Sequence, residues 1–349
     1  MVGRFFSDPK HLVGAIAPVS GLRLIMMGTG TFAEPTLEAL LAGSDPVVGL
    51  VTQPDRAGST VRGSTRQVGK GMKSIAEAAG VPVIQPESIN TPEGIAALKA
   101  WNADLLVVAA YGQILIDDVI NSARIGAINV HASLLPRYRG AAPIAWAIDR
   151  GETLSGVTII RISTGLDAGD MLLQSSVPID LYETAGELEA RLAPMGGRMA
   201  VAVIEQIKNG TVSGMKQDPA LITRAPKIRK EHGLIDWTKS AEQIERRVRA
   251  MQPWPTAYTF LHRSNKPAMR MIVNRTSVAD MSPVNLGDEP GRLAGEGDRL
   301  FVRCGMGSLV IHEVQPAGKK RMAVGEFLRG YTVHPSDRVG PEMIDGVTS

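Results

Sequence analysis

Short apolar runs alternate with amphipathic segments along the first 210 residues of the chain. The apolar runs have the length of buried strands, and the segments between them have the spacing of helices with one apolar side. Strands that alternate with helices predict an α/β fold whose parallel sheet is covered on both faces. The expected strands lie at 22–28, 47–53, 81–85, 104–112, 126–131, 155–163 and 170–180, and the expected helices at 31–43, 72–80, 92–102 and 184–210.

The pattern changes after Gly210. Polar, irregular sequence rich in Lys and Arg comes next and is typical of a linker. One helix is expected at 240–251, and the short apolar pieces that follow it, separated by Gly, Pro, Asn and Asp, favour a small β-barrel. The predicted divisions are an α/β domain at 22–210, a linker at 211–232, a smaller β-barrel domain at 233–332 and a tail at 333–349.

The first 21 residues combine basic residues with a short apolar patch that Asp8 and Pro9 interrupt. A secretory signal needs a continuous apolar segment of roughly 7–15 residues followed by small residues. We therefore interpret residues 1–21 as a disordered leader or an over-long start, with no strand or helix before Leu22. The last dozen residues are also expected to be disordered.

The composition is that of a globular protein, with 44% hydrophobic and 21% charged residues among 349. No apolar run approaches the roughly 18 residues of a membrane-spanning helix, so no membrane partner is expected. Cys304 is the single cysteine, which excludes a disulfide framework or a cysteine-based zinc site within one chain. These features fit a reducing, cytoplasmic location, and no metal site is predicted.

The net charge of +3 conceals an asymmetry. Residues 226–338 carry 19 basic and 12 acidic residues, whereas residues 1–225 carry 19 basic and 21 acidic ones. This difference suggests that the neutral first part carries out the chemistry and that the basic second part contacts a polyanion. Chance variation in surface charge explains the same counts equally well.

A glycine-rich turn, GTGTFA (28–33), follows the first expected strand and opens a helix. With Asp55 further along, it resembles part of a dinucleotide-binding fingerprint. Such turns also occur wherever backbone must pass close to backbone. We favour that structural interpretation and keep dinucleotide binding as an alternative.

Three polar residues form a better candidate site. Asn129 and His131 are two apart at the end of an apolar strand, so their side chains point to the same face. Asp167 lies in a glycine-flanked loop, TGLDAGD, between two further expected strands. An amide and a protonated imidazole can stabilise an oxyanion, and a carboxylate can orient the imidazole, which is the equipment of acyl transfer. Taken singly, a histidine at a strand end is more often structural.

The sequence around these residues resembles that of a known family. INVHASLLPRYRGAAPI (128–144), followed by STGLDAGDML (163–172), resembles the signature of formyltransferases that use 10-formyltetrahydrofolate. The resemblance extends over residues 22–332, with a C-terminal motif typical of the branch that acts on methionyl-tRNA. The further segments are VTQPDRAG (51–58), AAYGQIL (109–115), QPWPTAY (252–258) and the C-terminal motif QPAGKKRM (315–322).

The resemblance implies a Rossmann-like formyltransferase domain followed by an OB-like β-barrel domain. It implies that Asn129, His131 and Asp167 are catalytic. It also implies that two loops bind the folate through backbone groups and apolar side chains. These loops comprise Tyr111, Gly112, Gln113, Ile114 and Leu115, and Ser133, Leu134, Leu135 and Pro136.

Residues 56–73 depart from the family pattern, because the usual prolines are missing. The stretch still carries five basic residues and no acidic one, which suits a contact with RNA phosphates. A solvated loop is the plainer interpretation. The predicted tRNA-binding residues are Arg56, Arg62, Arg66 and Lys70 here, and Lys319, Lys320 and Arg321 near the C-terminus.

The resemblance thus predicts an enzyme that moves the formyl group of 10-formyltetrahydrofolate to the α-amino group of methionyl-initiator tRNA, for translation initiation. We expect this enzyme to be a monomer. Two alternatives stay open. One is a folate-dependent formyltransferase that acts on an amino sugar or a purine precursor. The other is a dinucleotide-binding oxidoreductase, which would depend on GTGTFA.

Overall fold

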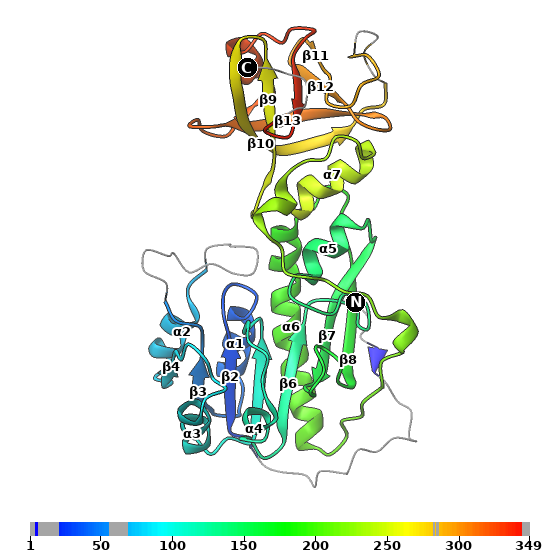
Figure 1. Ribbon diagram of the computed structural model, residues 1–349. Helices are drawn as coiled ribbons and strands as arrows, with labels where there is room; N and C mark the ends of the chain where they lie inside the picture. The colour runs from blue at the N-terminus through cyan, green and yellow to red at the C-terminus, as the bar shows by residue number, and fades with distance from the viewer. Residues whose placement is uncertain (1–3, 6–20, 56–68, 282, 284–285, 344–349) are drawn as a thin grey trace. The chain divides into compact units, whose positions relative to one another are not determined.

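A computed structural model describes residues 4–5, 21–55, 69–281, 283 and 286–343. The chain divides into two compact units that interleave along the sequence (Figure 1). The first comprises residues 1–144, 153–180 and 186–227, and the second comprises 145–152, 181–185 and 228–349. The sequence predicts consecutive domains, so the two short insertions were not anticipated, and the predicted bounds at 210 and 233 stay a prediction.

The first unit is built on an eight-stranded sheet in the order β1-β8-β7-β6-β5-β2-β3-β4. The strands from β2 to β6 run parallel to one another, and their carboxyl ends therefore meet at one edge. The strands are β1 (Arg4–Phe5), β2 (Leu24–Gly28), β3 (Val47–Val51), β4 (Val83–Ile84), β5 (Leu105–Ala109), β6 (Gly126–His131), β7 (Leu154–Arg161) and β8 (Met171–Pro178).

The predicted parallel sheet is confirmed from β2 to β6, but at one side the pairing is antiparallel. β7 pairs antiparallel with β6 and with β8, and β8 pairs antiparallel with β1. Residues 162–170 connect β7 directly to β8, and a connection this short has no room for the crossover that parallel neighbours need. The prediction that no strand precedes Leu22 is wrong, because Arg4 and Phe5 pair with Gln174 and Leu173.

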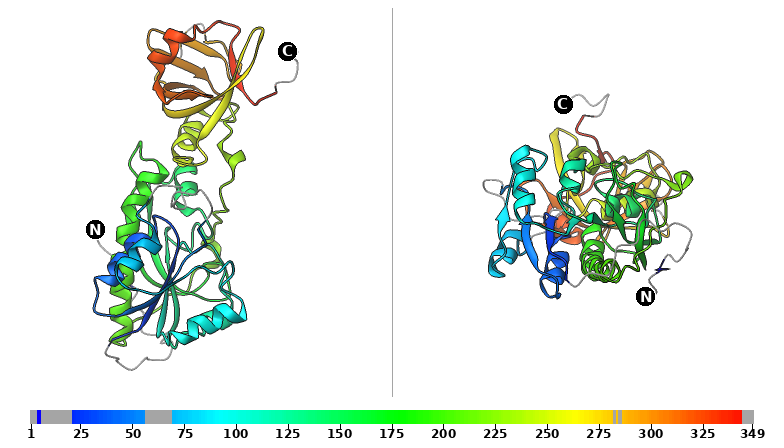
Figure 2. Two further views of the ribbon diagram at one scale, coloured as in Figure 1. Left: turned by 90° about the vertical axis from the view of Figure 1, so that its left-hand side faces the viewer. Right: turned by 90° about the horizontal axis from the view of Figure 1, so that it is seen from below.

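Helices cover both faces of this sheet (Figure 2). Ile89, Leu98 and Val119, from α3, α4 and the loop before α3, pack with alternate residues of β2 and β5 in one apolar cluster. On the other face α6 packs against α1, where Gly197 allows close contact with the Pro35 backbone. The helices are α1 (Glu34–Leu41), α2 (Met72–Ala78), α3 (Pro92–Ala100), α4 (Asp117–Ile120), α5 (Pro143–Asp149) and α6 (Ala185–Lys208).

The second unit contains an antiparallel half-barrel in the order β11-β12-β13-β10-β9-β15, with β14 paired to β13. Register shifts between Val273 and Thr276 bend the long strand β10, as bulges do, and help the sheet to curve. The elements are α7 (Ala241–Ala250), β9 (Ala257–Arg263), β10 (Lys266–Val278), β11 (Leu293–Glu296), β12 (Arg299–Arg303), β13 (Ser308–Pro316), β14 (Met322–Ala323), α8 (Val324–Gly330) and β15 (Arg338–Gly340).

Two features of this unit differ from the sequence-based expectation. Arg338–Gly340 lie in the predicted tail, yet they form β15 on the edge of β9. The end of α5 also folds with this unit, because Asp149 forms an ion pair of 2.7 Å with Arg247 of α7. Burial raises the pKa of Asp149 and Arg247 opposes that rise.

None of the helices in the described ranges combines the length and the apolar composition that crossing a membrane requires.

Candidate active site

Asn129 and His131 lie at the C-terminal end of β6, at the edge where the parallel strands end. Asn129 lies opposite Val108 of β5 and Ile160 of β7, in the middle of the sheet. His131 is 5% exposed, whereas Asn129 is partly exposed. Their common face confirms the alternation expected for residues two apart in a strand.

Asp167 reaches the same place from the loop between β7 and β8. Its Oδ1 accepts a hydrogen bond of 3.4 Å from Asn129 Nδ2. Its Oδ2 lies 3.7 Å from His131 Nδ1, within ion-pair range but beyond a direct hydrogen bond. The structure therefore brings the three predicted residues together, although they are up to 38 positions apart in the sequence.

The hydrogen bond of His131 to the backbone decides which ring nitrogen faces Asp167. Nε2 lies 3.0 Å from the carbonyl oxygen of Tyr138. A carbonyl oxygen only accepts, so Nε2 must carry the hydrogen. Neutral His131 then has its lone pair on Nδ1. Only the imidazolium form donates from Nδ1, the nitrogen that lies 3.7 Å from Asp167 Oδ2.

Asp167 is held at its carboxylate and at its main chain by residues that the sequence pattern did not single out. The backbone N–H of Gly140 donates to Oδ2 over 2.8 Å. The side-chain amide of Gln217 donates to the carbonyl oxygens of Asp167 and Gly169, and Arg139 donates to that amide's oxygen. Gln217 belongs to the stretch interpreted as a linker, where nothing in the local pattern marks one buried amide.

The first predicted folate loop follows β5, next to β6. Tyr111 and Leu115 are buried in the apolar core of the sheet, with exposures of 2% and 7%. Burial raises the pKa of Tyr111 to about 12, so its hydroxyl stays neutral. Gln113 bonds to the backbone of Glu87 and Ile89. Gly112 is exposed, and Ile114 is 71% exposed, which leaves an apolar side chain at this edge.

The second predicted folate loop, Ser133 to Pro136, follows β6 directly and is mostly buried. Its backbone is fixed from β7 and β8. The Thr158 hydroxyl donates to Ser133 O and accepts from Leu135 N, and Gln174 donates to Leu135 O. Both loops therefore start from neighbouring parallel strands beside Asn129 and His131, and the folate-binding role of their residues stays a prediction.

The predicted tRNA-binding residues fall into three groups. Arg56, Arg62 and Arg66 lie outside the described residues. Lys70 is exposed and forms an ion pair of 2.7 Å with Glu38, which raises the pKa of Lys70. In the second unit Lys319, Lys320 and Arg321 are exposed, and Arg321 pairs with Glu313 over 2.6 Å.

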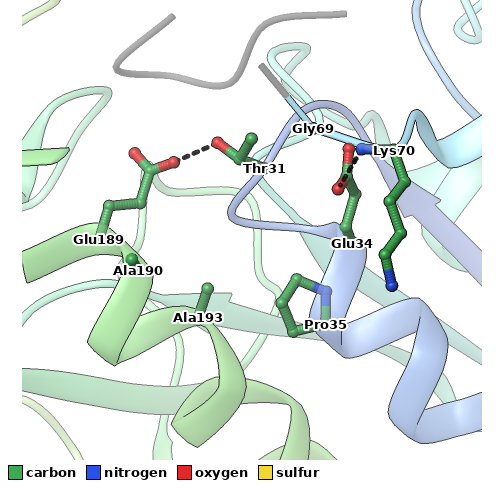
Figure 3. Close-up of a pocket in the computed structure, with 8 residues that line it drawn as sticks. All are labelled: Thr31, Glu34, Pro35, Gly69, Lys70, Glu189, Ala190 and Ala193. Atoms are coloured by element: carbon green, nitrogen blue, oxygen red, sulfur yellow. Dashed lines mark hydrogen bonds between the residues drawn. The ribbon is translucent and has the colours of Figure 1, made fainter. Parts of the chain in front are cut away.

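A cavity of about 380 Å³ opens beside the N-terminal end of α1. Figure 3 shows Thr31 bonded to Glu189 on one side and Glu34 beside Gly69 and Lys70 on the other. Its lining residues are Thr31, Glu34, Pro35, Gly69, Lys70, Glu189, Ala190 and Ala193. The three candidate catalytic residues do not line it, so we assign the chemistry to their cluster rather than to this cavity.

The GTGTFA turn has a structural explanation. A side chain on Gly28 would lie 2.7 Å from Ala33 and 2.9 Å from the carbonyl oxygen of Ala109. Gly30 has a φ of +77°, which glycine adopts without strain. The turn is thus required for close passage of β2 into α1. Among the described residues, no group of three or more His, Cys, Asp or Glu side chains is placed to hold a metal ion.

Two parts of the chain match known families. Residues 22–204 match the formyl transferase family and residues 227–332 match the formyl transferase C-terminal domain. The chain is 42% identical over 324 residues to a methionyl-tRNA formyltransferase of Citrifermentans bemidjiense, which covers 92% of this chain and 98% of that protein. The methionyl-tRNA formyltransferase of Acidobacterium capsulatum is 44% identical over 91% of this chain and all of its own length.

This chain belongs to the methionyl-tRNA formyltransferase family.

Solved structures support the fold of this methionyl-tRNA formyltransferase family member. The sugar 3N-formyl transferase WlaRD matches with a TM-score of 0.62, at 18% identity over 86% of this chain and 100% of that one. An N-formyltransferase from Helicobacter canadensis, solved with folinic acid and dTDP-3-aminofucose, matches with a TM-score of 0.61 at 18% identity, over 83% of this chain and 98% of its own. At these identities the likeness concerns the fold alone.

Proposed function

We propose that this protein transfers the formyl group of 10-formyltetrahydrofolate to the α-amino group of methionyl-initiator tRNA. The observation that carries the proposal is the meeting of Asn129, His131 and Asp167 at the carboxyl edge of the sheet. Ligands of open α/β sheets bind at that edge. An amide and an imidazole can stabilise the oxyanion of acyl transfer to an amine, and a carboxylate can accept a proton.

The first step is attack of the methionine amine on the formyl carbon, with the formyl oxygen becoming an oxyanion. Asn129 Nδ2 and the protonated Nδ1 of His131 are the donors that stabilise it. The intermediate then collapses, the bond between carbon and folate nitrogen breaks, and tetrahydrofolate leaves. The proton lost by the amine passes to the leaving folate nitrogen, with the Asp167 carboxylate as the local base.

The folate loops supply a suitable place for the donor. Backbone groups of the two loops at the ends of β5 and β6 can bind the polar edge of a pterin, and the exposed Ile114 offers apolar surface. Because these loops flank Asn129 and His131 in sequence and in the sheet, a folate bound there brings its formyl group to the same edge.

The choice of methionyl-tRNA as acceptor is supported by sequence similarity over nearly the whole chain. The relatives at 42% and 44% identity carry that name, whereas the sugar formyl transferase is 18% identical. The basic second part of the chain also suits a polyanionic substrate. The monomeric state and the cytoplasmic location stay predictions.

The decisive experiment is a formylation assay with 10-formyltetrahydrofolate and four acceptors. These are methionyl-initiator tRNA, methionyl-elongator tRNA, free methionine and an amino sugar nucleotide. We expect rapid formylation of the initiator tRNA and at least about 100-fold lower kcat/KM for each of the others, a difference of about 2.7 kcal/mol in transition-state binding. Formylation of the sugar in preference to tRNA would overturn the proposal, and the His131→Ala variant serves as the control with reduced activity.

A further inference from the structure

Gln217 lies in the polar stretch between the two family matches and has its side chain in contact with the candidate active site. It is 9% exposed. Its Nε2 donates to the carbonyl oxygen of Asp167 over 2.7 Å and to that of Gly169 over 2.8 Å. Its Oε1 accepts from Arg139, over 3.0 Å from Nε and 2.8 Å from Nη2.

These partners fix the orientation of the amide. Carbonyl oxygens only accept and a guanidinium only donates, so the nitrogen must face the Asp167 loop and the oxygen must face Arg139. Both hydrogens of the amide nitrogen and two acceptor positions of its oxygen are used. A buried amide with all of these partners specifies one arrangement of the groups around it.

The loop that Gln217 holds has an unfavourable backbone conformation. Asp167 has a φ of +49°, in the left-handed region that non-glycine residues rarely adopt. The two carbonyl groups bonded to Gln217 lie on either side of Ala168, so one amide spans the turn. Contacts from outside the loop are therefore needed to keep the Asp167 carboxylate at one position.

The carboxylate of Asp167 is held by Gly140, whose neighbour Arg139 is bonded to the same segment as Gln217. The N–H of Gly140 donates to Asp167 Oδ2, and the neighbouring residue Arg139 exchanges backbone hydrogen bonds with Thr223 and Ala225. Arg139 itself donates to Gln217. The bonds thus form a closed ring. It runs from the main chain of Asp167 through Gln217, Arg139 and Gly140 back to the carboxylate of Asp167.

We propose that Gln217 is a positioning residue for formyl transfer, which holds the Asp167 loop so that the carboxylate faces His131 Nδ1 and Asn129 Nδ2. This inference rests on the proposed function. Gln217 acts through Asp167 and does not itself touch the reacting groups. Its loss should therefore reduce kcat and leave the KM values for folate and tRNA unchanged, because misplacement of a catalytic group by about 1 Å can cost about 100-fold.

The test is the substitution Gln217→Glu. Glutamate keeps the shape and the bonds from Arg139, but its carboxylate has no hydrogen for the carbonyls of Asp167 and Gly169. We expect kcat to fall about 10- to 100-fold, with both KM values within about twofold of wild type. Gln252→Glu is the matched control, since the amide of Gln252 also donates to two carbonyl oxygens, of Val248 and Asn274, in the second unit. It should lower the melting temperature without lowering kcat.

A double-mutant cycle separates positioning from stability. In an Asp167→Asn background, Gln217→Glu should lower kcat little further, because the group that it positions is already disabled. Three results would overturn the proposal: wild-type kcat in Gln217→Glu, full multiplication of the two losses, or an equal loss in Gln252→Glu. If Gln217→Glu does not fold, Gln217→Met takes its place in the same cycle. A wild-type protein that fails to formylate methionyl-tRNA would instead refute the proposed function.

Discussion

His131 presents a single nitrogen to the candidate active site. Its Nε2 is committed to the carbonyl of Tyr138, so Nδ1 must do the chemistry, and it donates only in the imidazolium form. The Asp167 carboxylate lies 3.7 Å from this nitrogen. At the scale of single residues, the candidate site therefore joins a histidine at a strand end to a carboxylate from a separate loop.

We expect His131→Ala and Asn129→Ala each to lower kcat by about 100-fold or more, the scale of losing one oxyanion donor. The KM for folate should change little, because neither side chain is assigned to the pterin. Steady-state kinetics with both substrates measures this. His262→Ala is a suitable control, since His262 also bonds to a backbone carbonyl, of Pro341, in the second unit. Wild-type kcat in either active-site variant would refute its assignment.

Asp167→Asn should change both the height and the shape of the pH–rate profile. Asparagine cannot take the proton of the attacking amine, so the limb of the profile that depends on this base should be lost. The measurement is kcat from pH 5 to 10 in both proteins. A lower profile of unchanged shape would mean that Asp167 acts only through structure.

At the scale of elements, the β7–β8 connection determines where Asp167 lies. β7 runs antiparallel to β6, from Thr158 opposite His131 to Arg161 opposite Ile128. The loop that follows must therefore fold back toward His131 to bring Asp167 beside it. Gly169 makes this possible, because a Cβ there would overlap the carbonyl oxygen of Arg161. The loop is thus compressed against the strand that precedes it.

We expect Gly169→Ala to lower kcat by about 10-fold or more, since the backbone must shift to accommodate the methyl group and would carry Asp167 with it. Gly330→Ala is the matched control, because a Cβ at Gly330 has no atom within 4 Å. Kinetics and thermal unfolding of both variants test this. Equal activity in the two variants would show that the loop tolerates displacement.

The short strand β1 leads to a different expectation. Its two residues pair with β8 at the edge of the sheet, on the far side of β7 and β8 from β6. Deleting residues 1–5 removes few backbone hydrogen bonds, each with a net value of about 0.5–1.5 kcal/mol. The melting temperature should fall by a few degrees and kcat should be unchanged. A loss of kcat would show that this edge supports the active site.

At the scale of the whole molecule, we expect the two basic regions, residues 56–73 and the second unit, to have separate roles in tRNA binding. Lys319 and Lys320 are exposed on the second unit, which carries the basic excess. Changing both to alanine should raise KM for initiator and elongator tRNA alike and flatten the salt dependence, because phosphate contacts release counterions without reading sequence. Arg321 is better left in place, since it pairs with Glu313.

Arg56→Ala should instead lower kcat/KM for the initiator tRNA more than for the elongator tRNA. Arg56 follows β3 of the catalytic sheet in sequence, and contacts formed mainly in the transition state appear as selectivity. Measuring kcat/KM for both tRNAs at two salt concentrations tests both variants together. The same loss on both tRNAs with the same salt slope would refute the division of roles, while the formyltransferase assignment would stand.

The sequence by itself determined the alternation of strands and helices, the antiparallel β unit and the candidate trio, because these depend on local periodicity and on short motifs. Only the tertiary structure decided the features that depend on contacts between residues far apart in the sequence. It reversed β7, gave Asp167 its left-handed conformation, and brought the end of α5 into the second unit through Asp149 and Arg247. It also placed Gln217, from a stretch without any local signal, on the carbonyl of Asp167, because a buried amide takes its partners from whatever the fold brings near it.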